Sequence, residues 1–439
     1  MTQHPFERPK PSSSEQTLHL VQHASVHINS LQIFLIFFKL GCISFGGPAA
    51  HLVFFHQKFV QQLKWFTGEQ YSQLVALSQI IPGPSSSQVG IAIGYLTRGY
   101  IGSFSAWLGF TLPSFILMTL LAYLGQHFFS ALNAEIFHVL KLIVLAVVVF
   151  AFWQMLKTFC NTVWQYLLML ASALFIYISD LNLSQIILIF VAAICGLIFS
   201  NKTIKRNSTK SHKKNNTKSA STHTLTENLK LPKQSIPAYL WLIVFIIPFA
   251  IFILLKTQFN HPALHSLESF YTSASMVFGG GHIVLPLLHQ DLVNSGLISN
   301  EKFDLGYAVV QLMPGPLFTF ASYLGALLPI TDCILLNAVI ATIAIFLPSF
   351  FLIFGTLPYW SWLMKQEKIY RAVEGINAAV IGLLLCLIVQ MTQDYIRSWL
   401  DIVFVILVVL LLRTKLPVVV TIISSFSVYY FLLISINSV

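Results

Sequence analysis

The sequence predicts an all-α polytopic membrane protein with two homologous halves. Hydrophobic residues make up 56% of the chain and charged residues only 9%, and the mean hydropathy is +0.76. A soluble domain carries about 25% charged residues. Apolar stretches of the roughly 17–25 residues that cross a bilayer recur along the whole length. We therefore expect many membrane crossings, and no cleaved signal peptide, because residues 1–30 lack an apolar core.

A four-part pattern that occurs twice predicts the two halves. The first copy has Phe-Gly-Gly-Pro at 45–48, Glu69, Gln-Ile-Ile-Pro-Gly-Pro at 79–84 and Leu-Pro-Ser-Phe at 112–115. The second has Phe-Gly-Gly-Gly at 278–281, Glu301, Gln-Leu-Met-Pro-Gly-Pro at 311–316 and Leu-Pro-Ser-Phe at 347–350. Four landmarks in the same order at matching intervals indicate an internal duplication. Helix breakers at corresponding places of two apolar halves are the sequence signature of a transport site.

The apolar segments define 12–13 membrane segments in order along the chain. They are residues 31–47, 70–95, 101–126, 139–158, 163–179, 184–200, 238–256, 264–288, 303–328, 330–357, 371–392, 396–413 and 415–435. The expected regions are an N-terminal tail (1–30), a first repeat (31–200), a basic linker (201–236) and a second repeat (237–435) with an extra leading span (238–256).

The order of these segments predicts the topology. Seven crossings separate the two copies of the pattern, so the second half is expected upside down, as an inverted repeat. Nine of the 25 Lys and Arg residues lie between Lys202 and Lys233. Cytoplasmic loops accumulate such residues, which predicts a cytoplasmic linker and a cytoplasmic N-terminus. Lys58 and Lys64 fall on the opposite side in this scheme and are its exception.

The Pro-Gly-Pro triplets are expected to break their helices or to form re-entrant loops. Proline removes a backbone donor and glycine permits unusual dihedral angles. A helix that restarts inside the membrane presents free amides and the positive end of its dipole, which is a site for an anion. Residues 85–88 (Ser-Ser-Ser-Gln) add donors after the first break. The second break is followed by Leu-Phe-Thr-Phe, so the two halves are chemically unequal; a kink used only for packing is the alternative.

Ionisable residues inside or beside the segments are further candidates, since they are costly there. Lys39 precedes the first Gly-Gly turn and could neutralise an anion, and His51 and His282 follow the two turns. Lys141 and Glu374 occupy equivalent positions, although both could reach the interface from a span end. The candidate substrate-binding residues are Lys39, Gly46, Gly47, His51, Pro82, Gly83, Pro84, Ser85, Ser86, Ser87, Gln88, Gly279, Gly280, Gly281, His282, Pro314, Gly315, Pro316 and Thr319; the candidate coupling residues are Glu69, Lys141, Glu301 and Glu374.

No catalytic residue, cofactor or metal site is expected. His19, His23 and His27 share one helical face but lack an acidic or Cys partner nearby. A nucleic-acid partner is not expected, because the net charge of +10 is concentrated in the linker. ATP-driven pumping is disfavoured by the absence of a Gly-rich phosphate loop from the sequence. An integral membrane enzyme would need clustered His, Asp or Arg near the interface, and the sequence shows no such cluster.

These motifs resemble the long, two-domain form of the chromate transporter family. The resemblance covers nearly all of residues 31–435. Besides the duplicated pattern, it includes Lys39-Leu40-Gly41, His51, Trp65, Gln88, Gly94-Tyr95, Leu285-Pro286 and Tyr323-Leu324-Gly325. The resemblance implies export of chromate across a bacterial inner membrane, driven by a proton gradient or the membrane potential. Uptake of sulfate or another divalent oxyanion is the alternative, and a homodimer is left open.

Overall fold

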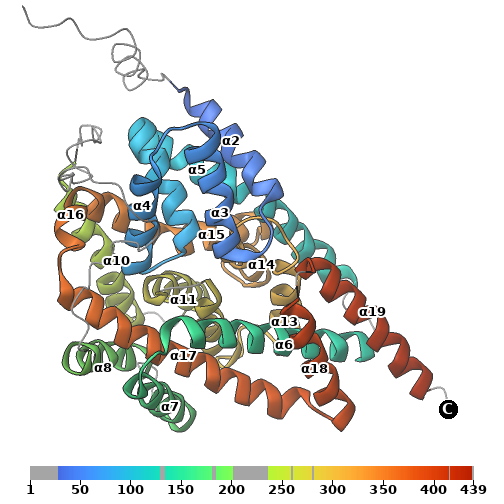
Figure 1. The fold of residues 1–439 in the computed structure, drawn as a ribbon. Helices are drawn as coiled ribbons and strands as arrows, with labels where there is room; N and C mark the ends of the chain where they lie inside the picture. Colours follow the sequence, from blue (N-terminus) through green and yellow to red (C-terminus); the bar gives the residue numbers. More distant parts are fainter. Residues whose placement is uncertain are drawn as a thin grey trace, which may run out of the picture.

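The computed structural model describes residues 28–128, 134–179, 184–200, 236–258, 261–278, 281–414 and 416–437. In these residues helices are the only regular elements, as the sequence predicts, and they form two series in the same order (Figure 1). Residues 1–27 of the N-terminal tail, which include His19, His23 and His27, and nearly all of the basic linker lie outside the described residues.

Each series begins with a helix that leads into a Gly-Gly turn. The first consists of α2 (Ser30–Ile43), α3 (Gly47–Phe55), η1 (His56–Gln62), α4 (Gly68–Ile80), α5 (Ser85–Phe128), α6 (Ala134–Phe159), α7 (Val163–Ile178) and α8 (Ser184–Phe199). After α10 (Ala238–Gln258), the second consists of α11 (Pro262–Met276), η3 (Gly281–Ile283), α12 (Val284–Leu288), η4 (His289–Val293), α13 (Asn300–Val310), η5 (Leu317–Thr319), α14 (Phe320–Leu327), α15 (Ile334–Thr356), η6 (Leu357–Tyr359), α16 (Trp360–Leu363), α17 (Glu367–Tyr395), α18 (Trp399–Leu412) and α19 (Val418–Asn437). Both repeats carry a π-helix at the same point, η1 and η4.

The segments predicted to cross the membrane are of two kinds. Six helices among the described residues are long and apolar enough for a full crossing, namely Ser85–Gly125, Glu135–Phe159, Ala238–Lys256, Ile334–Leu363, Glu367–Tyr395 and Val418–Ser435. Five further apolar helices are shorter, including α7 with 16 residues. A helix of that length rises about 24 Å, less than the roughly 30 Å hydrocarbon core. The predicted 12–13 segments are therefore a mixture of full-length and short helices.

The Pro-Gly-Pro triplets divide two predicted segments, 70–95 and 303–328. In the first repeat α4 ends at Ile80 and α5 begins at Ser85. In the second, α13 ends at Val310 and η5 begins at Leu317. Gly83 and Gly315 have φ angles of +129° and +101°, which L side chains rarely adopt. The breaks follow directly from this backbone chemistry.

A second reversal makes α5 a hairpin of two helices. Arg98 (φ −149°) and Gly99 (φ 63°) interrupt it, and the chain then returns along itself. The Ser103 hydroxyl donates to the Ile91 carbonyl at 3.0 Å. Glycines at 94 and 102 allow the two backbones to touch, because a Cβ at either one would collide with the carbonyl of the other. The segment after the first break is therefore a short helix that turns back after Thr97.

The last two helices of each repeat pack on the long helix of the other repeat. Helices α7 and α8 contact α17, whereas α18 and α19 contact α6 (Figure 1). The equivalent helices α6 and α17 lie side by side and run in opposite directions, with Lys141 near the start of α6 over the ring of Tyr395 at the end of α17. A two-fold axis that exchanges two antiparallel neighbours is perpendicular to both. Because α6 and α17 are both candidate spans, this arrangement favours the predicted inverted repeat.

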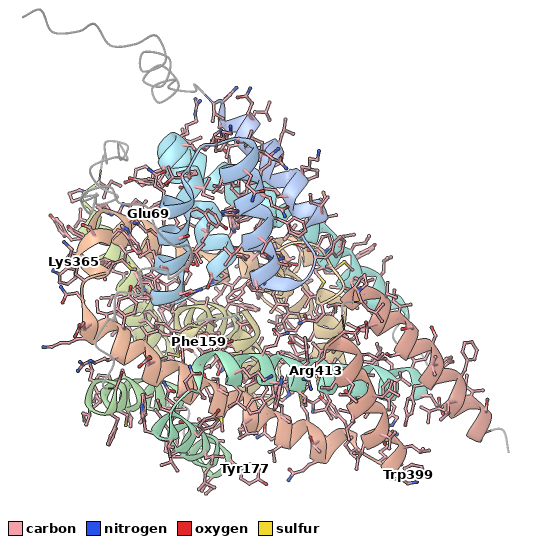
Figure 2. All side chains as sticks on the ribbon, viewed as in Figure 1. Glu69, Phe159, Tyr177, Lys365, Trp399 and Arg413 are labelled. Atoms are coloured by element: carbon pink, nitrogen blue, oxygen red, sulfur yellow. The ribbon has the colours of Figure 1, made fainter. Side chains whose placement is uncertain are left out.

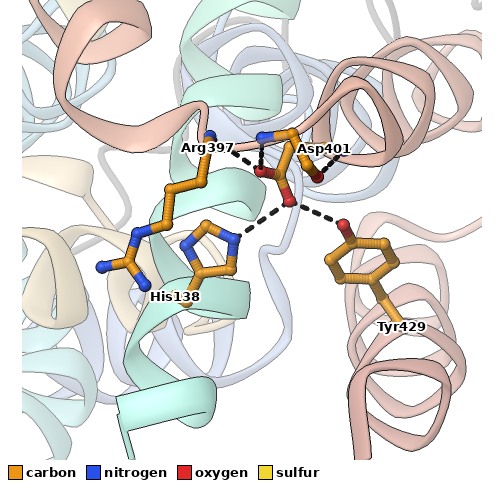
Figure 3. Close-up of polar contacts among 5 residues, drawn as sticks. His138, Arg397, Asp401 and Tyr429 are labelled. Carbon is orange, nitrogen blue, oxygen red and sulfur yellow. Dashed lines mark hydrogen bonds and ion pairs between the residues drawn. The ribbon is translucent and has the colours of Figure 1, made fainter. Parts of the chain in front are cut away.

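A buried carboxylate fixes α18 and α19 to α6 (Figure 3). Asp401 Oδ1 accepts hydrogen bonds from Tyr429 Oη at 2.6 Å and from His138 Nε2 at 3.0 Å. Its Oδ2 accepts the backbone amides of Arg397 and Ser398, each at 2.8 Å. With four donors the carboxylate is well satisfied, and it occupies a helix N-terminus that favours negative charge. Asp401 therefore connects the end of the second repeat to the first.

Candidate functional site

The two Pro-Gly-Pro breaks lie at the contact between the repeats and interlock reciprocally. The Gly83 amide donates to the Val277 carbonyl at 2.7 Å, and the Gly315 amide donates to the Ser44 carbonyl at 2.9 Å. Val277 and Ser44 are the equivalent residues just before the two Phe-Gly-Gly turns. Each break is thus bonded to the turn of the other repeat, which explains why the two motifs are duplicated together.

The Leu-Pro-Ser-Phe motifs complete this arrangement. A Cβ at Gly83 would lie 2.8 Å from Ser349 Oγ, and one at Gly315 would lie 2.7 Å from Ser114 Oγ. Both serines are fully buried and belong to the opposite repeat. Glycine is required at both breaks because neither position has room for a side chain.

The residues that follow the two Gly-Gly pairs, Pro48 and Gly281, meet at this contact. A Cβ at Gly281 would lie 3.3 Å from Pro48 Cγ, and these are equivalent positions of the two repeats. A residue that touches its own equivalent lies close to the two-fold axis. Gly279 and Gly280 lie outside the described residues, as does the side chain of His282.

Polar side chains gather around the start of α5. Residues 85–88 are buried, and this first turn is where a helix leaves its amides without intrahelical partners. The Ser85 hydroxyl donates to the Ser78 carbonyl at 3.1 Å. Gln88 Nε2 donates across the break to the Pro82 carbonyl at 2.6 Å. His51 Nδ1 forms a hydrogen bond with Ser86 Oγ at 3.3 Å. These contacts hold α3 and α5 in position at the break.

Several buried polar atoms here have no hydrogen-bond partner among the described residues. They are Ser44 Oγ, His51 Nε2, Ser87 Oγ, Gln88 Oε1, Thr111 Oγ1 and Ser349 Oγ. An unsatisfied buried polar group costs about 1–3 kcal/mol, and such groups are rare enough to need an explanation. Four of the six are hydroxyls, which can turn their protons toward an acceptor. These hydroxyls are chemically suited to an oxyanion, whereas Gln88 Oε1 can only accept a hydrogen bond.

The second break offers fewer donors, as the sequence predicts. Leu317 and Phe318 are buried there. Thr319 uses its hydroxyl within the turn, donating to the Pro316 carbonyl at 2.7 Å. The donor set therefore belongs mainly to the first repeat.

His51 is neutral at physiological pH. Burial lowers its pKa to about 4, against a smaller opposing effect of the Ser44 backbone carbonyl. A neutral imidazole can donate one hydrogen bond without placing a charge in the site. The donors around α5 are then uncharged, and the groups that they offer are hydrogen-bond donors and the helix dipole.

The charged candidates lie apart from this cluster. Lys39 is exposed on α2, and Glu69 is exposed at the start of α4, near the periphery of the molecule (Figure 2). Lys141 Nζ pairs with Glu301 Oε1 at 2.9 Å. Glu374 accepts a hydrogen bond from Ser200 Oγ at 2.6 Å. Among the candidate coupling residues, Lys141 and Glu301 are the pair that the structure brings together. Their ion pair links the first repeat to the second.

Sequence reasoning missed residues that the structure places at the repeat contact. Ser114 and Ser349 lie in a motif recognised as duplicated but not selected as a site. Ser44 directly precedes the first turn, and a search for hydroxyls beside glycine turns would have found it. Asp304, which is buried on α13, is an ionisable residue inside a predicted segment, and that signal was available in the sequence.

Comparisons with known proteins agree with the duplicated architecture. The model of the chromate transporter family matches residues 31–197 and 264–430. An uncharacterized transporter of Methanocaldococcus jannaschii is 27% identical, over 82% of this chain and 84% of its own. A probable chromate transport protein of Synechococcus elongatus is 25% identical over 84% and 85%, and a chromate transport protein of Pseudomonas aeruginosa is 23% identical over 82% and 81%. No solved structure matches the chain.

Proposed function

We propose that this chain, which belongs to the chromate transporter family, is a secondary transporter that exports chromate. The observation that carries the proposal is the set of buried, unpartnered hydroxyls of Ser44, Ser87 and Ser349 near the contact where the two repeats interlock. Chromate is a tetrahedral divalent oxyanion with acceptors on every corner. Two relatives whose names mention chromate transport cover more than four fifths of this chain.

The interlocked breaks supply a physical basis for alternating access. The two inter-repeat bonds, from Gly83 and from Gly315, cross the contact in opposite directions. Inverted-repeat transporters move one part against the other around a fixed midplane site. An anion that supplies acceptors to the Ser44 and Ser87 hydroxyls would replace part of this interface and bias that movement. In this proposal the breaks serve both for binding and as hinges.

The test is initial-rate flux in proteoliposomes that contain the purified protein. Chromate, sulfate and molybdate are compared under imposed pH and voltage gradients, with protein-free vesicles and Gly83→Leu as controls. We expect saturable chromate flux in the wild type and loss of flux in Gly83→Leu. Wild-type vesicles without saturable chromate flux under any gradient would refute the proposal.

Sulfate uptake is the second candidate, because sulfate has the same charge and nearly the same shape. An uncharged donor set distinguishes the two anions only by size and acceptor strength, since it contains no group specific to either one. A kcat/KM for sulfate well above that for chromate, with inward movement favoured, would select this alternative.

Orientation and compartment follow from the charge pattern in the proposal. We place the protein in the inner membrane of a bacterial cell. Its N-terminus and linker then lie in the cytoplasm. A cysteine introduced at Ser219 in a cysteine-free background tests this, because Cys42 and Cys333 are exposed and would react themselves. Labelling of intact cells by an impermeant reagent would contradict the orientation.

A further inference from the structure

Asp304 is a buried carboxylate with incomplete hydrogen bonding. It lies on α13 and is 1% exposed. Tyr395 Oη, at the end of α17, donates to its Oδ2 at 2.5 Å. Its Oδ1 is buried and has no hydrogen-bond partner among the described residues. The carboxylate of Asp401, by contrast, accepts four hydrogen bonds.

The low number of donors makes the ionised form of Asp304 costly. A buried carboxylate needs several hydrogen bonds or an adjacent counter-ion to offset the loss of its hydration. A single phenol hydroxyl supplies part of that, and a proton on Oδ1 would remove the charge. Two protonation states of Asp304 are therefore accessible at modest cost, unlike those of a fully satisfied carboxylate.

A charged pair near Asp304 reaches the surface. Glu301 lies one helical turn before it and is 48% exposed. Glu301 pairs with Lys141, whose ammonium stands 5.5 Å over the ring of Tyr395. The hydrogen bond from Lys141 holds the pKa of Glu301 below its usual range, so Glu301 stays ionised at the entrance.

Other titratable groups face Asp304 from the surrounding helices. Asp394 of α17 and Tyr323 of α14 act on it electrostatically. The Tyr323 hydroxyl is committed to the Lys302 carbonyl at 2.8 Å. Glu301 and Asp394 place negative charge near Asp304, and Lys141 places positive charge there.

We propose that Asp304 is the proton-binding residue that couples oxyanion movement to the pH gradient. The inference rests on the proposed transport function and names its coupling site. The step is reversible protonation: the carboxylate takes one proton from water and becomes a neutral carboxylic acid, with no other bond made or broken. Release returns the same proton to water on the other side.

The position of α13 gives this protonation a mechanical consequence. The helix packs on α6 and α5 of the first repeat and on α14 of the second. It ends at Val310 and leads into the second break, where the Gly315 amide is bonded to the Ser44 carbonyl. Loss of the charge at Asp304 weakens its attraction to Lys141 across the repeats. The consequent movement of α13 reaches Ser44, one of the donors of the proposed anion site.

The equivalent position in the first repeat shows that this role is not duplicated. Subtracting 232 from 304 gives Ser72, which is exposed and donates to the Gly68 carbonyl at 2.8 Å. The first repeat therefore carries most of the oxyanion donors and the second carries the buried acid. Anion and proton are assigned to different halves of the molecule.

The experiment separates coupling from substrate movement by comparing two flux modes in proteoliposomes. One is net chromate transport driven by a pH gradient, and the other is exchange of chromate across the membrane at equal pH. For Asp304→Asn we expect at least a tenfold loss of driven transport and exchange within about twofold of wild type. Asp332→Asn, the same carboxylate-to-amide change at an exposed residue between α14 and α15, is the matched control and retains both modes.

Full driven transport in Asp304→Asn overturns the proposal, and so does equal loss of both modes, which would make Asp304 a structural or substrate residue. If the wild-type protein shows no chromate flux in either mode, the proposed function is refuted instead. Wild-type chromate flux without accompanying proton movement, measured with a trapped pH dye, leaves that function standing and overturns the role of Asp304.

A second variant keeps the test decisive if Asp304→Asn does not fold. Tyr395→Phe removes the hydrogen bond that stabilises the ionised carboxylate. The pH of half-maximal driven transport should then rise by about one to two units, because a hydrogen bond to a charged group accounts for roughly that shift. An unchanged pH profile in a folded Tyr395→Phe protein contradicts the inference.

Discussion

Replacing Gly83 with alanine tests whether the first break is a precise element of the site. The φ angle of Gly83 is +129°, a conformation that alanine rarely adopts. The added Cβ would collide with Gln88 Nε2 and lie 2.8 Å from Ser349 Oγ. The substitution therefore strains the backbone and also displaces the Gln88 amide from the break.

The magnitude follows from these two effects. A non-glycine residue held in such a backbone region costs about 1–3 kcal/mol. The displaced amide loses its 2.6 Å bond to the Pro82 carbonyl, which contributes about 0.5–1.5 kcal/mol. We expect a total loss of about 1.5–4.5 kcal/mol in stability for Gly83→Ala.

Gly296 provides a matched control for the strain alone. Its φ angle is +78°, and a Cβ there would meet nothing within 4 Å. Gly296→Ala should cost about 1–2 kcal/mol and leave chromate flux unchanged. Thermal unfolding of the purified variants in lipid nanodiscs gives the stability difference, and initial-rate flux in proteoliposomes gives the function.

The decisive quantity is flux at a temperature where both variants are folded. We expect at least a tenfold loss in Gly83→Ala, because the start of α5 moves relative to Ser44 and Ser349. If the two alanine variants lose equal stability and keep equal flux, the contacts at Gly83 do not matter and the break serves packing only.

Three further predictions concern the donor cluster and the end of the second repeat. Ser87→Ala removes an unpartnered hydroxyl, so it should raise stability by about 1–3 kcal/mol and raise the KM for chromate about tenfold or more. Ser103→Ala removes a hydroxyl bonded to the backbone, so it should lower stability and leave the KM unchanged. Transport kinetics and thermal unfolding distinguish the two variants. Burial in the folded protein lowers the pKa of His51 to about 4, from the usual 6.5 of an exposed imidazole. The contribution of His51 to stability is therefore complete above pH 6.5 and falls by up to about 3 kcal/mol toward pH 4. His51→Gln should flatten that part of the pH dependence of the thermal midpoint, and an unaltered profile would contradict the assignment. Tyr429→Phe removes a donor from the buried Asp401 and should cost about 1.5–3 kcal/mol of stability without altering the KM, whereas a changed KM would place this cluster in the transport path.

The sequence was sufficient for features that depend on local chemistry. The helix breaks at the Pro-Gly-Pro triplets appear where predicted, because proline and glycine act on their own backbone. The unequal character of the two breaks was also visible, since residues 85–88 are polar and residues 317–320 are mostly apolar. Composition alone indicated the membrane, and the spacing of the motifs indicated the duplication.

The surroundings of the charged residues were harder to predict from the sequence. Lys39 lies within a predicted segment, yet its side chain is exposed on α2. Glu69 and Glu301 are equivalent in sequence, but only Glu301 faces a partner from the other repeat. A side chain's surroundings depend on which face of its helix is covered, and residues far away in the chain determine that.

The membrane class, the two repeats and the helix breaks could be predicted from the sequence. Composition sets the first, repeated motifs mark the second, and proline and glycine set the third through their own backbone. The contacts between the repeats could not be predicted in this way: each break bonds to the residue before the Phe-Gly-Gly sequence of the other repeat, α7 and α8 pack on α17, α18 and α19 pack on α6, and Asp304 bonds to Tyr395 of α17. These relations join residues between about 90 and 270 positions apart. Hydrogen bonding and packing across such separations are fixed only when the two repeats fold against each other.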